Sequence, residues 1–440
     1  MIMYRIIEID SVRYEISESQ RVAKMFRMDE YSTQSELVIL SNVVHDGISY
    51  PVKSIDYYAC YDNCQLRRVV IPEGVEVIDG CAFEGCTALE EVIFPSTLKI
   101  IKEYAFGRCK ALNEVVLPDS VEYVGYFVFK DCTALKRATL SPHIEEVSEQ
   151  LFSGCTSLRE VKLYEGLQRI GRQAFANCTS LVDVSIPDSV TRIGEYAFWG
   201  CSSLTKVTLS DNCPDVSWDA FNQCASLQFI NHKDVILNGE YILSADCKVI
   251  LSCLLPDNNQ SILIPHGVKV LGDRAFSYRE NLENIYLPEG LERIGKECFS
   301  ACISLRSVKL PSTLIEIDNE AFQQCEELRH ITIPEGVVWL GDYALAYCSE
   351  LRSIMVMWDG TVWGKHVLEC CYELRHIIVP ESKVLSLKIA LLREGDTASY
   401  NDDEEHPLAQ LVTTSHVVDK GNSNVWHELW INNDDVTYLS

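Results

Sequence analysis

Hydrophobic side chains recur along most of this chain in a pattern with a period of 23 residues. Residues 180–201 read SLVDVSIPDSVTRIGEYAFWGC, and the apolar positions of this stretch fall into three groups that Pro187 and Gly194 separate. The cysteines show the period most clearly, because they recur at this step in two runs: Cys86, Cys109, Cys132, Cys155, Cys178, Cys201 and Cys224, then Cys302, Cys325, Cys348 and Cys371. Internal repetition at this length is typical of a chain that winds into stacked coils.

Each repeat predicts three short segments. The L-x-x-V-x-I stretch is rich in β-branched residues and ends at a proline, which predicts a short strand that pairs in parallel with its copies in the coils above and below. The following [VL]-x-x-I-G stretch turns a second apolar pair inward, and we expect its glycine to supply permissive backbone at a bend. These glycines are Gly125, Gly171, Gly194, Gly272, Gly295 and Gly341. The A-F-x-x-C stretch then returns the chain as a short helical or 3₁₀ turn.

One repeat cannot bury its own apolar side chains, because a single coil is one layer thick, whereas stacked coils share a continuous core. The fold class that we predict is therefore a solenoid of about fourteen 23-residue coils, with stacked parallel β-strands and short 3₁₀ or α turns. The step between strand starts widens from 23 to 32 residues between Leu227 and Asn259. Two apolar runs flank residues 245–248 there, which predicts one inserted hairpin that protrudes from the stack.

The repeat pattern divides the chain into five predicted parts. Residues 1–50 lack the repeat and should form an N-terminal cap, since an open end would expose a core layer and unpaired strand edges. Repeats fill residues 51–230, the coil with the inserted hairpin spans 231–260, and repeats resume over 261–380. Residues 381–440 are expected to cap the other end.

The motifs S-L-x-x-V-x-I-P, V-x-x-I-G and A-F-x-x-C closely resemble the BspA-like leucine-rich repeats of bacterial surface antigens, and residues 180–201 match that consensus almost throughout. The resemblance covers about residues 52–380, and the interruption near the middle and the lead-in LVILSNVVHDGISYPVKSID are similar to those of the family as well. It implies a leucine-rich repeat solenoid in a secreted or cell-surface bacterial protein that adheres to host matrix proteins or to other cells. It implies no catalytic residues.

Composition disfavours several classes of partner. The 38 basic and 64 acidic side chains leave a net charge of -26, which repels nucleic acid phosphates and anionic lipid headgroups. No stretch reaches the 18 apolar residues of a membrane span, so we expect no membrane insertion. Charged residues between Arg5 and Arg13 interrupt the apolar stretch that a secretory signal needs, which keeps a cytoplasmic location as the alternative to the cell surface.

The 19 cysteines are interpreted as core spacers and not as a metal or redox array. Equivalent side chains in a stack point in the same direction and do not converge, and buried cysteine behaves as a small hydrophobic residue. Cys60 with Cys64, and Cys370 with Cys371, depart from the period, so these are the pairs to test for a disulfide bond.

A column of arginines marks the candidate binding face. Arg306, Arg329, Arg352 and Arg375 occupy the second position of four successive strand motifs, His330 and His376 follow two of them, and Tyr286 is assigned to the same face. Four like charges on neighbouring strands repel each other, so the column predicts either a bound anion or acidic partner, or neutralisation by nearby carboxylates. Glu327, Glu350 and Glu373 each precede an arginine by two residues and could neutralise it; both interpretations stay open.

An apolar strip is predicted near the other end, where Val70, Ile93 and Val116 occupy the fifth position of successive strand motifs. Such a strip indicates either a protein contact or a surface that the cap or a curved sheet covers. His330 and His376 lie two coils apart, too far to share a metal ion or to act as a catalytic pair. The acidic run at residues 402–405 lacks the spacing of a calcium loop and is expected to be a solvated loop.

We find no catalytic or nucleotide-binding motif, so we predict no enzyme activity, no cofactor and no metal site. The function that we expect is non-enzymatic binding or adhesion, in which an elongated repeat surface holds a protein or glycan partner, including host matrix or another cell surface. The alternative is an intracellular protein-interaction scaffold, which the many apparently free thiols favour.

Overall fold

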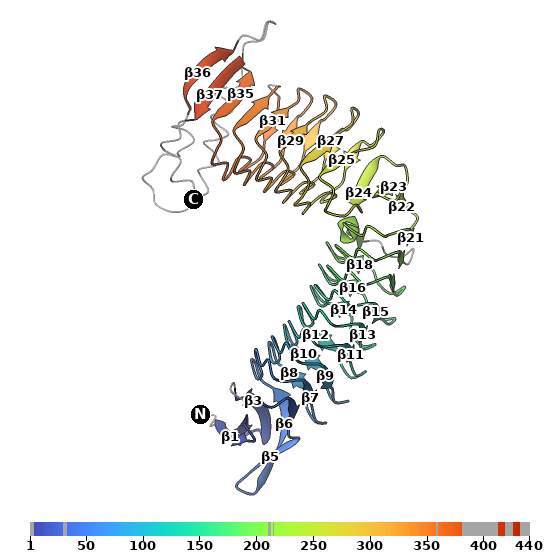
Figure 1. Ribbon diagram of the computed structural model, residues 1–440, viewed down its shortest axis with the longest axis vertical. Coiled ribbons are helices and arrows are strands. Elements are labelled where there is room, and N and C mark those ends of the chain that lie inside the picture. The colour runs from blue at the N-terminus through green and yellow to red at the C-terminus, as the bar shows by residue number, and fades with distance from the viewer. Residues whose placement is uncertain are drawn as a thin grey trace. The chain divides into compact units, whose positions relative to one another are not determined.

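The computed structural model describes residues 4–29, 33–209, 213, 215–357, 360–380, 412–418 and 426–431. The chain comprises two compact units, Met1–Lys233 and Asp234–Ser440. Each unit is built from stacked coils, and the chain as a whole contains about 14 turns of roughly 23 residues with almost no helix (Figure 1). The predicted solenoid is therefore confirmed.

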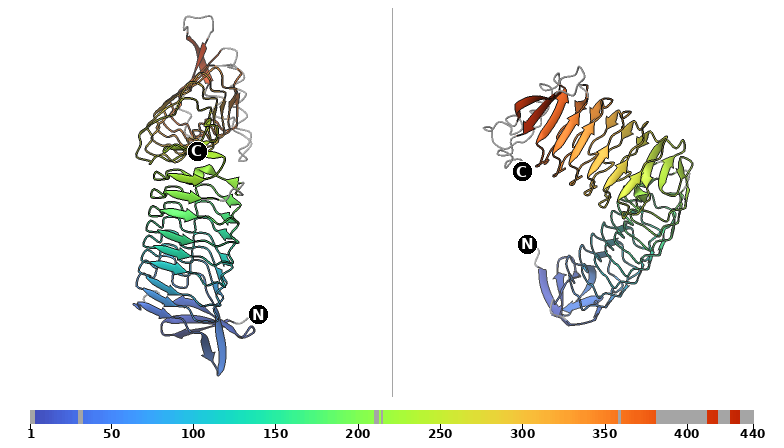
Figure 2. Two further views of the ribbon diagram at one scale, coloured as in Figure 1. Left: turned by 90° about the vertical axis from the view of Figure 1, so that its right-hand side faces the viewer. Right: turned by 45° about the horizontal axis from the view of Figure 1, so that its top comes forward.

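Each coil of the first unit contributes two short strands, where the sequence predicted one strand and a bend. The first strands are β4 (Glu36–Val38), β7 (Arg68–Val70), β9 (Glu91–Ile93), β11 (Glu114–Val116), β13 (Arg137–Thr139), β15 (Glu160–Lys162), β17 (Asp183–Ser185), β19 (Lys206–Thr208) and β21 (Phe229–Asn231). The second strands are β8 (Val77–Ile78), β10 (Ile100–Ile101), β12 (Tyr123–Val124), β14 (Glu146–Val147), β16 (Arg169–Ile170), β18 (Arg192–Ile193) and β20 (Asp215–Val216). Within each sheet, strands of successive coils pair in parallel at equivalent residues (Figure 2), and the sheets are interrupted between β9 and β11, between β12 and β14, and between β15 and β17. The [VL]-x-x-I-G stretch is thus a second sheet face.

The N-terminal residues form antiparallel strands that continue into the second sheet of the first unit. These strands are β1 (Tyr4–Ile9), β2 (Val12–Ser17), β3 (Val22–Met28), β5 (Asn42–His45) and β6 (Ile48–Ile55). The sheet order runs from β1 through β2, β3 and β6 to β8, and β5 pairs with β6. This arrangement covers the open end of the first coils with paired backbone.

The second unit has the same two faces. Its first strands are β25 (Ser261–Leu263), β27 (Asn284–Tyr286), β29 (Ser307–Lys309), β31 (His330–Ile333), β33 (Ser353–Val356) and β35 (His376–Pro380), followed in the sheet by β37 (Trp426–Ile431) and β36 (Val412–Val418). Its second strands are β26 (Val270–Leu271), β28 (Arg293–Ile294), β30 (Glu316–Ile317), β32 (Trp339–Leu340) and β34 (Val362–Trp363). Most of the predicted C-terminal cap lies outside the described residues.

The insertion is a three-stranded antiparallel sheet at the start of the second unit. It consists of β22 (Val235–Leu237), β23 (Tyr241–Ser244) and β24 (Val249–Cys253), and β24 then pairs in parallel with β26. The predicted hairpin around residues 245–248 is present between β23 and β24. The prediction that it protrudes is wrong, because Tyr241, Ile242 and Ile250 are fully buried. The insertion therefore covers the first coil of this unit.

The return segments form a third backbone ladder between coils. In one coil, the Phe175 amide donates to the Ala197 carbonyl of the next coil at 2.7 Å, while the Ala176 amide donates to Gln173 of its own coil at 3.1 Å. This alternation depends on left-handed backbone at Gln173 (φ 53°) and Asn177 (φ 58°). In the described residues only η1 (Trp218–Phe221) is a 3₁₀ helix, so the return is mainly a series of turns and not the helical turn predicted.

The core of each unit is a continuous column of phenylalanine rings. The rings of Phe83, Phe106, Phe129, Phe152, Phe175, Phe198 and Phe221 stack in the first unit, with neighbouring centroids 5.2–5.8 Å apart and planes within 14° of parallel. Phe276, Phe299 and Phe322 stack in the same way in the second unit. Each ring therefore buries its faces against its own copies, which no isolated coil can do.

The repeated cysteine donates a hydrogen bond to the backbone of this column. The Cys178 thiol donates to the Phe152 carbonyl of the preceding coil at 3.2 Å, and the other cysteines of the period repeat the contact 26 residues back. Burial raises the pKa of the Cys178 thiol well above its ordinary value, so the thiol stays protonated and can donate. Cysteine is thus a spacer, as predicted, and also satisfies a buried carbonyl.

Arg279 takes over the role of the cysteine in the coil that follows the insertion. Its side chain is fully buried, and its guanidinium donates to the carbonyls of Cys253, Leu255 and Pro256. The Cys253 carbonyl lies 26 residues back, at the position that accepts from the thiol in the coils that carry the repeated cysteine. The five donors of arginine can satisfy the additional carbonyls at the end of the insertion, where one thiol could satisfy only one.

The repeat glycines have a different role from the predicted one. None of the six has a positive φ; instead, each lies against the backbone of the preceding coil. A Cβ atom on Gly341 would lie 2.3 Å from the Asn319 nitrogen, and one on Gly194 would lie 2.9 Å from the Arg172 nitrogen. Glycine is therefore required at these positions by the close approach of two coils.

Replacing Gly341 with alanine should destabilise the second unit by about 2 kcal/mol or more, because neither backbone can yield without shifting a coil. Urea unfolding measures the change. The matched control is Gly107→Ala, since a Cβ atom there meets its nearest atoms at an ordinary 3.5 Å. Equal stability of the two variants would contradict the close-approach explanation.

Candidate binding surfaces

The arginine column is a continuous feature of the first strand face in the second unit. The amide of Arg352 donates to the Arg329 carbonyl at 2.8 Å, and the amide of Arg375 donates to the Arg352 carbonyl at 3.0 Å. Arg306 precedes them, with a 3.4 Å bond from the Arg329 amide. The side chains of Arg306, Arg352 and Arg375 are each about half exposed, at 49–52%. The column therefore presents its guanidinium groups outward on four adjacent coils.

Neutralisation of the column is incomplete. Glu350 pairs with Arg352 at 3.3 Å and Glu373 pairs with Arg375 at 2.9 Å, as the spacing predicted. The expected pair between Glu327 and Arg329 does not form, because Glu327 reaches back one coil to Arg306 at 2.9 Å, where Glu283 also binds at 3.0 Å.

Arg329 is exposed as a result, and no hydrogen bond or ion pair of its side chain is present among the described residues. Its neighbours on either side in the column have carboxylate partners. The column therefore leaves one guanidinium in its middle available to an external acceptor.

The other residues of the candidate face lie along the same strands. His330 is exposed, and its Nδ1 lies 2.8 Å from the Ser353 hydroxyl. Ser353 in turn faces His376 in the strand register, so the two histidines are separated by two coils, as expected. Tyr286 lies at the far end of β27, exposed beside Leu263. The face thus combines one open guanidinium with an imidazole and a phenol.

The apolar strip of the first unit is partly exposed. Val116 is 56% exposed, Ile93 is also exposed, and Val70 is half-buried. The N-terminal strand β4 adds exposed Val38, which faces Val70 in the register. Sequence reasoning missed Val38 because it precedes the first repeat and has no place in the 23-residue period.

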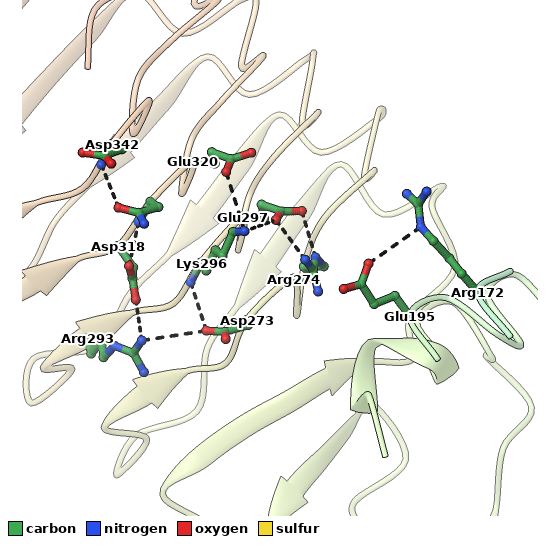
Figure 3. A network of polar contacts seen from close by, with 11 residues as sticks. Arg172, Glu195, Asp273, Arg274, Arg293, Lys296, Glu297, Asp318, Glu320 and Asp342 are labelled. Atoms are coloured by element: carbon green, nitrogen blue, oxygen red, sulfur yellow. Dashed lines mark hydrogen bonds and ion pairs between the residues drawn. The ribbon is translucent and has the colours of Figure 1, made fainter. Parts of the chain in front are cut away.

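A network of ion pairs joins the return segments of the second unit (Figure 3). Arg274 donates two hydrogen bonds to Glu297, at 2.8 and 3.0 Å, and Lys296 lies 3.1 Å from Glu297 and 3.7 Å from Glu320. Burial alone would raise the pKa of Glu297, but the hydrogen bonds from Arg274 and the charge of Lys296 hold this pKa below its ordinary value. The charged column of these return segments is therefore neutralised between coils. Arg329, on the first strand face, has no such partner among the described residues.

Other candidate chemistry has no geometric support among the described residues. Cys60, Cys64, Cys370 and Cys371 form no disulfide bond, and no group of three His, Cys, Asp or Glu side chains gathers as metal ligands among the described residues. No helix in the described ranges has the length and hydrophobicity that a bilayer span requires. The acidic run at 402–405 lies outside the described residues.

Stacked two-faced coils with a phenylalanine column define the chain as a leucine-rich repeat protein. Its sequence matches the family described as "BspA type Leucine rich repeat region (6 copies)" over residues 53–181, 127–250 and 269–389, and the chain belongs to that family. The family resemblance seen in the sequence is thereby confirmed. Repeats of this family are associated with protein binding or adhesion, and leucine-rich repeat proteins are generally non-enzymatic scaffolds.

Comparison with one solved structure supports the fold. A leucine-rich cell surface protein from Faecalibacterium prausnitzii is 25% identical, with a TM-score of 0.52, over 88% of this chain and 97% of its own. A leucine-rich repeat protein from Bacteroides ovatus is 21% identical, with a TM-score of 0.38, over 81% and 98% of the two chains. The pneumococcal vaccine antigen PcpA is 19% identical, with a TM-score of 0.42, over 86% and 88%. No protein with a curated description matches the sequence.

The Glu297 network predicts a stability that depends on pH. Glu297→Gln should cost about 1–2 kcal/mol at pH 7, because Arg274 and Lys296 lose their shared carboxylate while Glu297 is only 19% exposed. Since the pKa of Glu297 is lowered in the folded state, its contribution is present above the ordinary carboxyl pKa and is lost as pH falls through the lowered value. Urea unfolding at pH 7 and pH 3 measures both cases.

The control is Glu280→Gln, which alters an exposed carboxylate with no ion pair among the described residues. This control should change stability little at either pH. A Glu297→Gln effect of the same size at pH 3 as at pH 7 would show that the network does not act through the carboxylate charge.

Proposed function

We propose that the protein is a non-enzymatic binding and adhesion protein that holds a protein or glycan partner through the arginine column of its second unit. The observation that carries this proposal is the exposed Arg329 guanidinium, which lacks a carboxylate among the described residues although the chain has a net charge of -26. An acidic chain offers many carboxylates for neutralisation, so a column that leaves one arginine open favours an acceptor from outside.

The chemistry of the face selects carboxylates on the partner. A guanidinium presents paired donors in a planar fork that matches a carboxylate, and Arg329 offers this fork with no carboxylate bound to it among the described residues. His330 adds a donor or acceptor on the same side, next to Arg329. Acidic side chains of a protein supply several such carboxylates in a row, which suits a column spread over four coils.

A location of this protein at the cell surface is supported by the similar Faecalibacterium prausnitzii protein, which is named as a leucine-rich cell surface protein. The alternative is a scaffold inside the cell, which the absence of disulfide bonds among the 19 cysteines favours, since reducing compartments keep thiols from forming disulfides. Protease treatment of intact cells separates the two locations, because only a surface protein is degraded.

Reversing the charge of Arg329 and Arg352 together should weaken binding to an immobilised glutamate-rich peptide by about tenfold or more, since two attractive contacts become repulsive. Thermal stability should stay within about 0.5 kcal/mol of the parent, because these side chains are exposed. Biolayer interferometry at low and moderate salt and a thermal melt provide the two readouts.

The matched control is Arg159→Glu, which alters an exposed arginine at the same repeat position of the first unit without an ion pair among the described residues. This control should bind the peptide as the parent does. Unchanged binding by the double variant combined with a lower melting temperature would assign the column to stability and would contradict the proposed function.

A further inference from the structure

The first coils of the first unit carry a second surface, which is rich in exposed aromatic rings. The return segments and adjoining strand ends of these coils contribute five exposed and two half-buried aromatic residues, named here the aromatic platform: Tyr57, Tyr58, Tyr61, Tyr123 and Tyr126, with Tyr104 and Phe127 half-buried. Five of these tyrosines are 38–51% exposed. Aromatic rings left in water at this density mark a binding surface more often than a structural one.

The rings form two groups. Tyr58 contacts Tyr57 at 4.0 Å and Tyr61 at 4.8 Å between ring centroids. On later coils, Phe127 stacks on Tyr104 at 4.5 Å and meets Tyr126 edge-on at 5.4 Å. Each group is therefore held in place by its own ring contacts.

The two groups belong to one ordered surface. The amide of Tyr58 donates to the Gly80 carbonyl at 3.3 Å, that of Cys81 to Glu103 at 2.9 Å, and that of Tyr104 to Tyr126 at 3.1 Å. These bonds join four successive coils in register. The two groups of rings are therefore held in place relative to each other.

The coil between the two groups lies beneath the rings. Its Gly80 and Cys81 are buried, and the Tyr57 ring lies over Gly80 so closely that a Cβ atom there would be 2.9 Å from the ring. Tyr58 and Tyr104 stand one coil before and one coil after Cys81 in the same column. The Tyr57 ring therefore extends the platform over the coil that separates the two groups.

Folding does not require aromatic residues in this column. Tyr58, Tyr104 and Phe127 have φ values of 58°, 55° and 63°, a region that bulky residues seldom adopt. The same column of the second unit begins with Arg274, Glu297 and Glu320, which the ion pairs in Figure 3 satisfy, and continues with the stacked rings of Tyr343 and His366. Outward ion pairs thus serve the fold equally well, so the rings need another explanation.

The polar groups around the rings indicate the class of ligand. The Tyr123 hydroxyl donates to Glu103 at 3.5 Å, and Arg108 donates to the Tyr61 hydroxyl at 3.3 Å while its guanidinium lies 6.0 Å from that ring. Glu84 lies near Cys81. Burial is the larger cause that raises the pKa of the Cys81 thiol, and the hydrogen bond with Glu84 raises this pKa further. Phenols, carboxylates, the Arg108 guanidinium and the Lys130 ammonium, 5.2 Å from the Phe127 ring, therefore surround the ring faces.

We infer that the aromatic platform binds a neutral oligosaccharide chain. A sugar ring has an apolar C–H face, which stacks on an aromatic ring, and an edge of hydroxyl groups, which the neighbouring carboxylates and phenols can bind. The carboxylates of Glu84 and Glu103 and the net charge of -26 disfavour sulfated or uronic acid chains. The aliphatic strip of Val38, Ile93 and Val116 on the first strands has no aromatic ring face on which a sugar could stack, and it fits a protein contact better.

This site is separate from the arginine column, so the two proposals can fail independently. The test is isothermal titration calorimetry of the full chain with cellohexaose, maltohexaose and mannohexaose, and with hexagalacturonate as the acidic comparison. The parent should bind at least one neutral hexasaccharide, and raising the salt concentration should change the affinity little. Hexagalacturonate should not bind at the platform.

The double variant Tyr57→Ala with Tyr126→Ala removes one ring from each group and should lower the affinity by about tenfold or more. The matched control is Tyr278→Ala with Tyr347→Ala, which removes two tyrosines of similar exposure, 40% each, from the second unit. This control should bind like the parent. Tyr57→Phe with Tyr126→Phe keeps the ring faces, so it should retain affinity within about threefold even if the alanine variant folds poorly.

Absence of binding to all three neutral chains would overturn the inference, as would equal affinity of the platform and control variants. If the platform variant instead loses adhesion to a protein-coated surface while no saccharide binds, the surface belongs to a protein partner and the inference is also wrong. The platform variant should still bind the glutamate-rich peptide, because that peptide tests the arginine column alone.

Discussion

The structure depends on the stacking of each coil on its own copies. A coil such as the one around Phe175 has no core by itself; its ring lies between Phe152 and Phe198, and its backbone amides donate to the next coil. The Cys178 thiol adds a bond to the preceding coil, and Gly194 allows the two backbones to approach closely. Because most coils repeat these contacts, the inward positions are strongly constrained, while the outward columns can carry almost any side chain.

That freedom explains why the outward columns differ so much between coils of the same fold. One repeat position carries Tyr58 and Tyr104 in the first unit but Arg274 and Glu297 in the second. Another carries the arginine column, in which all but Arg329 have a carboxylate partner among the described residues. Binding is therefore best sought where an outward column departs from mutual neutralisation, and not in a cavity of the kind that an enzyme needs.

The sequence predicted the inward residues well, because their period is a direct consequence of stacking. Phe, Cys and the strand starts were placed from spacing alone. Prediction from the sequence failed where a contact depends on the distance between coils. Gly341 was assigned to a bend, although it lies against Asn319 of the preceding coil. Glu327 was paired with Arg329, although its carboxylate binds Arg306. The aromatic platform was missed for the same reason, since its members occupy four different repeat positions that only the coil geometry brings together.

Removing one whole repeat tests the stacking account most directly. Deletion of residues 133–155 takes out 23 residues and should bring Phe129 onto Phe175 with every inward position in phase, whereas deletion of 136–155 removes 20 and puts the next coil out of phase. Circular dichroism and urea unfolding should show a folded, cooperative protein for the first deletion and loss of cooperative unfolding in the first unit for the second. Equal stability of the two deletions would contradict the account.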